Sequence, residues 1–215
     1  MLSCPEEWAE FFEEYMRDEV NRVIYYSEWE KKPLYVDVLG KLVYYREGRI
    51  YEELCSHPDK VIEHAEKGLV KCSTIFEGEE VRLDEHRVRF VNLPSARRVQ
   101  INQLKTQHVG KFISVEGLVS RASDIQPFTV KAAFECLACG RTVYKVMELT
   151  PTSKVTNPEI CKYCKTKNRF EYISNESELV DSQILKIQEF PENLKGGEQP
   201  RSVTVFLTED LTGTV

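Results

Sequence analysis

Four cysteines, arranged as two Cys-x-x-Cys pairs, are the residues of this 215-residue chain best suited to chemistry. The pairs are Cys136–Cys139 and Cys161–Cys164, and 21 residues separate them. Two such pairs can surround one tetrahedral Zn²⁺ with four thiolates. Four protein ligands leave no open coordination position for a catalytic water, so the spacing predicts a structural zinc site.

The residues around the two pairs favour the same chemistry. Gly140 directly follows the first pair and can turn the backbone around a metal, while lysines at 162, 165 and 167 can offset the thiolate charge. The alternative is a set of redox dithiols or a disulfide pair, although a thioredoxin-like motif needs only one Cys-x-x-Cys. No His-x-Glu element of the zinc deaminases accompanies either pair.

The composition, 41% hydrophobic and 30% charged, is typical of a soluble globular protein. No run of 18 apolar residues is present, and the first seven residues lack the basic and apolar regions of a signal peptide. We therefore expect a cytoplasmic, reducing location and no membrane partner. In that setting Cys4, Cys55 and Cys72 are expected to be free thiols.

The net charge of −6 is unevenly distributed along the chain. Residues 1–30 hold nine acids and two bases, whereas residues 94–172 hold thirteen bases and six acids. A basic middle segment keeps a nucleic-acid partner open in spite of the acidic total. Ordinary solvated surface charge explains these counts equally well.

The first 89 residues carry a mainly helical pattern. Apolar residues from Trp8 to Ile24 recur at helical spacing and predict one amphipathic helix with a core-facing stripe. A second helix is expected to begin near Ser56 and to end at Gly68. His57 and His64 are interpreted as surface residues, and residues 33–39 as a connecting strand of unassigned role.

From about residue 86 the apolar period changes to two, which predicts strands at 87–93, 111–119, 128–134, 182–189 and 201–207. The cysteine loop falls between the third and fourth of these strands and contains short candidate strands at 142–147 and 169–173. Short strands bounded by turn residues predict a small β-barrel of the oligonucleotide-binding (OB) type, with a zinc ribbon inserted in it. A β-sandwich is the main alternative.

The sequence contains no phosphate-binding Gly-x-x-x-x-Gly-Lys-Ser/Thr loop, no His-Glu-x-x-His and no nucleophile elbow. We therefore expect no catalysis by this chain itself. Arg97 and Arg98, just after Pro94, are either a phosphate-contacting pair or residues that hold a loop in place.

Three segments carry a more specific signal: Val109–Arg121, Val130–Cys139 and the run ELVDSQILKIQEFPENLKGGEQPRSVTVFLTEDL over 178–211. Together they closely resemble the N-terminal part of the mini-chromosome maintenance (MCM) replicative helicases, archaeal type. The resemblance covers roughly residues 90–215. Residues 1–89 match only in character, as the helical subdomain that precedes the barrel in that family.

The resemblance implies an α+β architecture in three parts. These are a helical bundle over 1–89, an OB-fold barrel over 90–134 and 174–215, and a Cys4 zinc-binding subdomain over 135–173. It also implies a homohexameric ring, possibly a double hexamer, that encircles single-stranded and double-stranded DNA. An AAA+ motor domain of the same protein, which uses ATP and Mg, would lie elsewhere, and the protein would be nucleoid-associated.

Position by position, the resemblance implies single-stranded DNA contacts at Arg121, Lys186 and Arg201, with Gln126 at a fourth position that is basic in the family. Strand alternation independently places Lys186 away from the barrel core, whereas Arg201 begins its strand beside Pro200. The family's communication loop corresponds to residues 188–200. Its members here include Gln188, Glu189, Gly196 and Gly197.

The leading hypothesis is therefore the DNA-binding, ring-forming N-terminal region of an ATP-dependent replicative helicase. One alternative is a stand-alone zinc-containing OB-fold protein that binds single-stranded DNA, for which Phe128 and Phe206 are the main outward aromatic residues. Another is a protein-interaction module. Because the family's barrel continues beyond the position of Val215, we expect a fragment whose barrel lacks its last strand.

Overall fold

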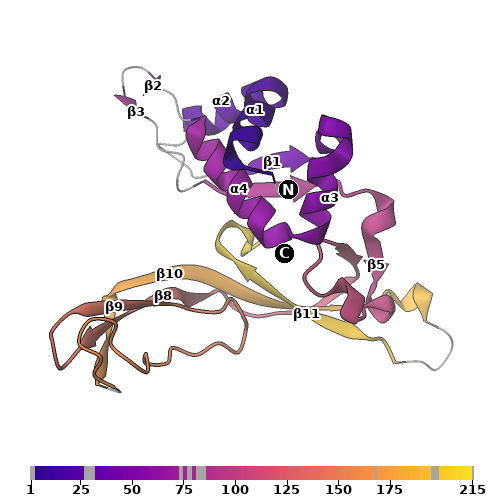
Figure 1. The fold of residues 1–215 in the computed structure, drawn as a ribbon. Helices are drawn as coiled ribbons and strands as arrows, with labels where there is room; N and C mark the ends of the chain where they lie inside the picture. The colour runs from indigo at the N-terminus through magenta and orange to yellow at the C-terminus, as the bar shows by residue number, and fades with distance from the viewer. Residues whose placement is uncertain are drawn as a thin grey trace. The chain divides into compact units, whose positions relative to one another are not determined.

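The computed structural model describes residues 3–26, 32–72, 75–76, 79–80, 86–167, 169–194 and 199–214. The chain divides into two compact units, Met1–Glu116 and Gly117–Val215, each of which is described by itself (Figure 1). Within the described ranges, no helix has both the length and the apolar character needed to cross a membrane.

The first unit is mainly helical, with α1 (Pro5–Tyr15), α2 (Arg17–Tyr26), α3 (Arg49–Ser56) and α4 (Pro58–Lys71). The prediction of one helix through residue 24 is wrong, because Met16 leaves the helical conformation with φ −137° and separates α1 from α2. Both Met16 and Val20 are nevertheless buried, so the break keeps the apolar side chains of both helices in the core.

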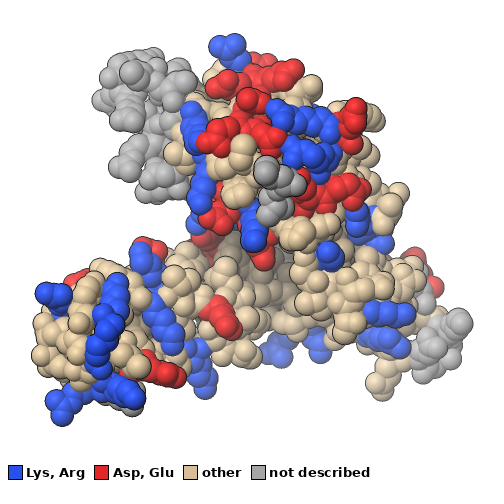
Figure 2. All heavy atoms as spheres, in the orientation of Figure 1, with Lys and Arg blue, Asp and Glu red and all other residues tan. Residues whose placement is uncertain are grey.

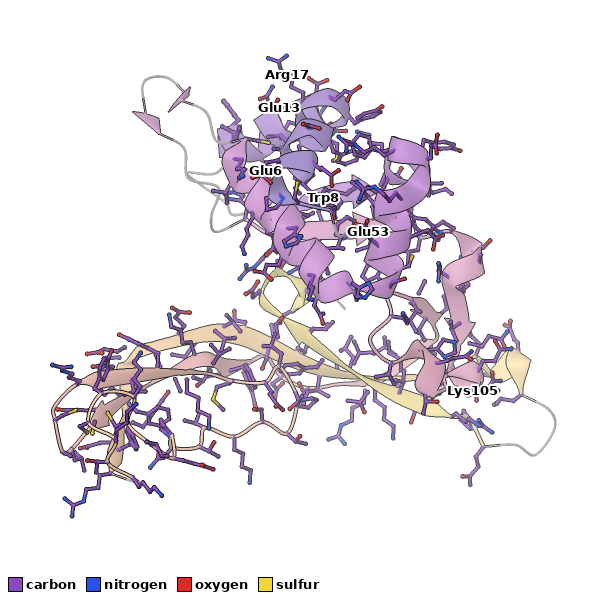
Figure 3. All side chains as sticks on the ribbon, in the orientation of Figure 1. Glu6, Trp8, Glu13, Arg17, Glu53 and Lys105 are labelled. Carbon is purple, nitrogen blue, oxygen red and sulfur yellow. The ribbon has the colours of Figure 1, made fainter. Side chains whose placement is uncertain are left out.

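α1 and α4 pack closely at Gly68, which lies inside α4 rather than at its end as predicted. A Cβ atom at position 68 would lie 2.5 Å from Trp8 Cβ and 2.8 Å from the Pro5 carbonyl oxygen. Trp8 is fully buried, and Figure 3 shows it inside the helical unit. The glycine is therefore required by close helix packing rather than by a helix end.

The segment predicted as a connecting strand forms β1 (Leu34–Asp37), which pairs in parallel with β4 (Val88–Val91). This pair contributes Leu34, Val36 and Val88 to the same core as the helices. The remaining pairs of the unit are β2 (Ile75–Phe76) with β3 (Glu79–Glu80), antiparallel, and β5 (Arg98–Gln100) with β6 (Ser114–Glu116), parallel.

Short helical turns complete the elements of both units. A π-helical turn spans Val38–Leu42, and 3₁₀ turns span Tyr45–Gly48, Ser95–Arg97, Ile101–Gln103, Thr106–His108, Pro191–Asn193 and Glu209–Leu211.

The second unit is an antiparallel sheet built around one long strand, β10 (Phe170–Gln188). The strands predicted at 169–173 and 182–189 are the two ends of this strand. Its partners are β7 (Leu118–Ala122), β8 (Gln126–Cys136) and β11 (Ser202–Thr208), and β8 also pairs with β9 (Thr142–Val146). Since β7 and β11 both pair with residues 185–188, they lie on opposite edges of β10.

The expected barrel is corrected to an open sheet. The predicted strand 111–119 splits at Gly117 into β6 and β7, and these two pair with different partners, β5 and β10. Within the part of the chain that the structure describes, no ladder joins β11 to β7, and closure of a barrel requires such a ladder.

The long β8–β10 ribbon is interrupted near its middle. Residue pairing jumps from Ile173↔Ala133 to Glu178↔Lys131, so β10 bulges between the two pairs. The hydroxyl of Ser177 fills the gap in the ladder, since it accepts the Ala133 N–H at 3.0 Å and donates to the Ile173 carbonyl at 2.7 Å. The subdomain boundaries predicted at 134/135 and 173/174 both lie inside these strands.

Candidate metal centre and nucleic-acid face

The four predicted metal ligands come from two turns at the β9 end of the second unit. Cys136 is the last residue of β8 and Cys139 lies in the turn that follows, while Cys161 and Cys164 lie in the segment between β9 and β10. Within each pair the carbonyl of the first cysteine accepts a backbone N–H from the residue after the second cysteine. The donors are Gly140 at 2.7 Å and Lys165 at 3.0 Å.

Both of these donor residues adopt left-handed backbone conformations. Gly140 has φ +67° and Lys165 has φ +62°, so the two turns share one geometry. The sequence predicted the first turn from its glycine. It gave no such signal at position 165, where lysine occupies a conformation that L-residues rarely adopt.

The four sulfur atoms converge on one point. They all lie within 4.8 Å of one another, with Cys136 and Cys164 Sγ 3.6 Å apart and Cys139 and Cys161 Sγ 3.9 Å apart. A tetrahedron with Zn–S bonds of about 2.3 Å has sulfur–sulfur edges of about 3.8 Å, which these distances match. The four thiols could therefore hold a zinc ion.

The same distances argue against the redox alternative. A disulfide requires about 2.05 Å between sulfur atoms, and the close contacts connect one Cys-x-x-Cys to the other rather than the two cysteines of one motif. Outside the cluster, Cys4, Cys55 and Cys72 are free, as predicted.

The thiol groups influence one another electrostatically. Hydrogen bonds from the side chain and backbone of Thr166 lower the pKa of Cys164 to about 6. The Arg141 N–H lowers the pKa of Cys139, but burial and the neighbouring thiols outweigh it and raise that pKa to about 12. A bound cation would favour the thiolate form of all four cysteines.

Cations surround the cysteine cluster. Figure 2 shows Lys and Arg side chains gathered over the β9 end of the second unit. Arg141 and Lys162 both lie over the Tyr163 ring, at 5.1 and 5.0 Å from its centroid. A small apolar core supports the site and consists of Ala132, Phe134, Cys136, Val143, Met147, Cys161 and Phe170.

Two of the three predicted DNA contacts lie opposite each other in the sheet. Lys186 of β10 is paired with Arg121 of β7, and paired residues of an antiparallel ladder project to the same face. Both side chains are exposed, whereas the adjacent Leu185 is buried on the other face. Gln126 is paired with Ser182 and therefore belongs to the Lys186 face as well.

Arg201 occupies a different position, just before β11. Its backbone N–H donates to Glu189 Oε2 at 2.8 Å, and the Glu189 N–H donates to its carbonyl at 3.1 Å. In the predicted communication loop, Gln188 ends β10 and Glu189 is buried. Gly196 and Gly197 lie outside the described residues.

The other candidates contact groups of the protein itself. Arg97 donates to Tyr51 Oη at 3.3 Å and to Glu52 Oε2 at 3.0 Å, and Arg98 pairs with Glu116 at 3.1 Å. These contacts favour a structural role over phosphate binding. His57 is exposed as predicted.

His64 differs from the surface residue that was expected. It is half-buried, and its Nδ1 donates to the Ser3 carbonyl at 2.5 Å. Ser3 itself is fully buried. The histidine thus helps to hold the segment before α1 against α4.

An antiparallel sheet with two exposed cations at the centre of one face, extended by a four-cysteine centre, defines a class of protein: an OB-type domain with an inserted metal knuckle. Residues 100–215 match the MCM OB domain, which is more than half of the chain. The chain therefore belongs to the MCM family.

Several curated proteins are similar to this chain. The DNA replication licensing factor MCM4 of Drosophila melanogaster is 26% identical over 166 residues, 77% of this chain and 19% of that protein. MCM6 of Arabidopsis thaliana is 33% identical over 126 residues, 58% of this chain and 15% of that protein. The mcm4 protein of Schizosaccharomyces pombe is 26% identical over 173 residues, 76% of this chain and 18% of that protein.

The chain thus spans less than a fifth of the length of these relatives. All three are eukaryotic proteins, so the archaeal type expected from the sequence, and with it a nucleoid location, has no support from them.

Proposed function

We propose that this chain is the N-terminal DNA-binding region of a replicative MCM helicase and guides single-stranded DNA for an ATP-dependent motor. The observation that carries the proposal is the pairing of Lys186 with Arg121 on the exposed face of a sheet that matches the MCM OB domain. Two adjacent cations can neutralise backbone phosphates without reading base sequence. Arg201, at the start of the neighbouring strand, extends the positive charge.

The metal centre has a structural role in this proposal. Zinc bound by Cys136, Cys139, Cys161 and Cys164 would stabilise a lobe whose own apolar core is small. The relatives' name, DNA replication licensing factor, supports action on chromosomal DNA. Assembly into a hexameric ring, single or double, and coupling through residues 188–200 to an AAA+ motor that uses ATP and Mg complete the proposal.

DNA binding is tested by a salt titration of single-stranded DNA affinity for the parent and for the triple variant Arg121→Ala, Lys186→Ala, Arg201→Ala. We expect the variant to bind at least tenfold more weakly at low salt, with a shallower dependence of log K on log salt, because fewer counterions are released. The matched control is Lys60→Ala, Lys67→Ala, Lys111→Ala, which removes the same charge from exposed positions of the first unit. Equal loss in both variants would attribute binding to net charge alone.

The oligomeric state of the same samples separates the proposal from its alternative. A ring requires self-association, which sedimentation at increasing protein concentration detects. A stand-alone single-stranded DNA-binding protein would bind DNA with the same cations and remain monomeric.

A further inference from the structure

The face of β10 that carries Lys186 also carries two phenylalanines. The strand is regular from 179 to 188, so its even-numbered residues share one face. Phe206 of β11 is paired with Ile184, and Phe128 of β8 is paired with Val180. We call this the outer face and define it by six residues: Arg121, Phe128, Ile184, Lys186, Thr204 and Phe206.

The two rings are in contact with each other but are not part of the buried core. Their centroids are 5.3 Å apart with an interplanar angle of 71°, an edge-to-face arrangement. Both side chains are only half-buried, and Ile184 beside them is 36% exposed. The apolar face of the sheet is the opposite one, where Leu185 is 4% exposed.

The rings lie close to the cations. Thr204 is the β11 partner of Lys186, and Phe206 is two residues further along, about 7 Å at the rise of a strand. One short stretch of single strand can therefore contact a cation and an aromatic ring on the same face. Cations for phosphates together with aromatic rings for bases are the usual composition of a surface that binds single strands without sequence preference.

We infer that Phe128 and Phe206 form a stacking platform for the unpaired bases of single-stranded DNA, while Arg121 and Lys186 contact its phosphates. This inference rests on the proposed function and adds to it a source of affinity that depends on the bases. It predicts discrimination against strands that lack bases. It also predicts little preference among bases, since every base presents a π-face.

The test compares oligothymidine with an abasic deoxyribose-phosphate strand of the same length, both binding to the 215-residue chain in anisotropy competition. We expect the parent to bind oligothymidine at least fivefold more tightly, the gain from about one stacked base. The double variant Phe128→Leu, Phe206→Leu keeps apolar bulk but removes the rings. It should bind both strands alike, with the salt dependence of the parent.

The matched control is Tyr44→Leu, which removes an aromatic side chain that is 75% exposed in the first unit. It should keep the discrimination of the parent. A folded double variant that still discriminates like the parent overturns the inference. If that variant melts early, Phe206→Trp replaces it: its added fluorescence should be quenched by oligothymidine and not by the abasic strand, and equal emission with both strands overturns the platform.

The results separate this inference from the proposed function. Failure of the parent to bind either strand at low salt removes both. Loss of binding in Arg121→Ala, Lys186→Ala, together with full discrimination in the leucine variant, retains the cationic site and removes only the aromatic platform.

Discussion

At the scale of single residues, the two cysteine turns pose the same backbone problem and solve it differently. Gly140 and Lys165 hold equivalent left-handed positions, but only glycine adopts that conformation at little cost. We expect Lys165→Gly to relieve about 1 kcal/mol of backbone strain. Because metal binding and folding of the lobe are coupled, zinc affinity in chelator competition should rise about fivefold.

Lys165→Ala is the control for charge, because it removes the ammonium group and keeps a Cβ at the left-handed position. It should bind zinc no more tightly than the parent. An equal gain in both variants would show that charge, rather than backbone strain, limits the site. Gly140→Ala should weaken zinc binding by a similar factor for the same conformational reason.

At the scale of elements, the α1–α4 contact depends on one position without a side chain. Gly68→Ala introduces a Cβ 2.5 Å from Trp8 Cβ, and the nearby Pro5 carbonyl leaves the new atom no room on that side. Overpacking of this kind typically costs 1–3 kcal/mol, which outweighs the gain in helix propensity from glycine to alanine. We expect a loss of about 2 kcal/mol in unfolding free energy from urea titration.

The matched control for this prediction is Lys67→Ala, one residue earlier in α4 on its exposed side, where the change should stay within about 0.5 kcal/mol. Trp8 emission should shift in Gly68→Ala alone. A stabilised Gly68→Ala would mean that α1 and α4 can separate without cost.

The elements also show how far sequence reasoning extends. Alternating patterns predicted the positions of β8, β9 and β11, and cysteine spacing predicted the metal ligands, because both are local properties of the chain. Strand pairing is not local. The split at Gly117, which sends β6 and β7 to different partners, and the Ser177 bulge inside β10 follow from tertiary pairing that periodicity does not contain.

The site was predictable to a similar extent. Parity along β10 predicted that Lys186 faces away from Leu185, but register with two neighbouring strands was needed to bring Arg121 opposite Lys186 and Phe206 near Phe128. The positive φ of Lys165 had no sequence signal at all, since lysine at that position usually marks ordinary surface.

At the scale of the whole molecule, stability comes from two separate sources. The first unit has a large apolar core that includes Trp8, Phe11, Phe12, Leu54 and Leu69, all fully buried. The cysteine lobe of the second unit has seven core residues, two of which are proposed zinc ligands. Metal loss should therefore affect the second unit far more than the first.

Both tryptophans of the chain, Trp8 and Trp29, belong to the first unit, so tryptophan fluorescence reports on that unit alone. We expect Cys161→Ser to release the metal, with zinc content falling from one per chain toward zero. Amide hydrogen exchange should accelerate over residues 131–173, where the ladder depends on the cysteine turns, while tryptophan emission and its urea midpoint stay unchanged. Cys55→Ser, at a buried cysteine outside the metal cluster, is the control and should leave the zinc content at one. Retention of one zinc by Cys161→Ser would contradict the four-thiolate site, and a shifted tryptophan midpoint would contradict separate sources of stability.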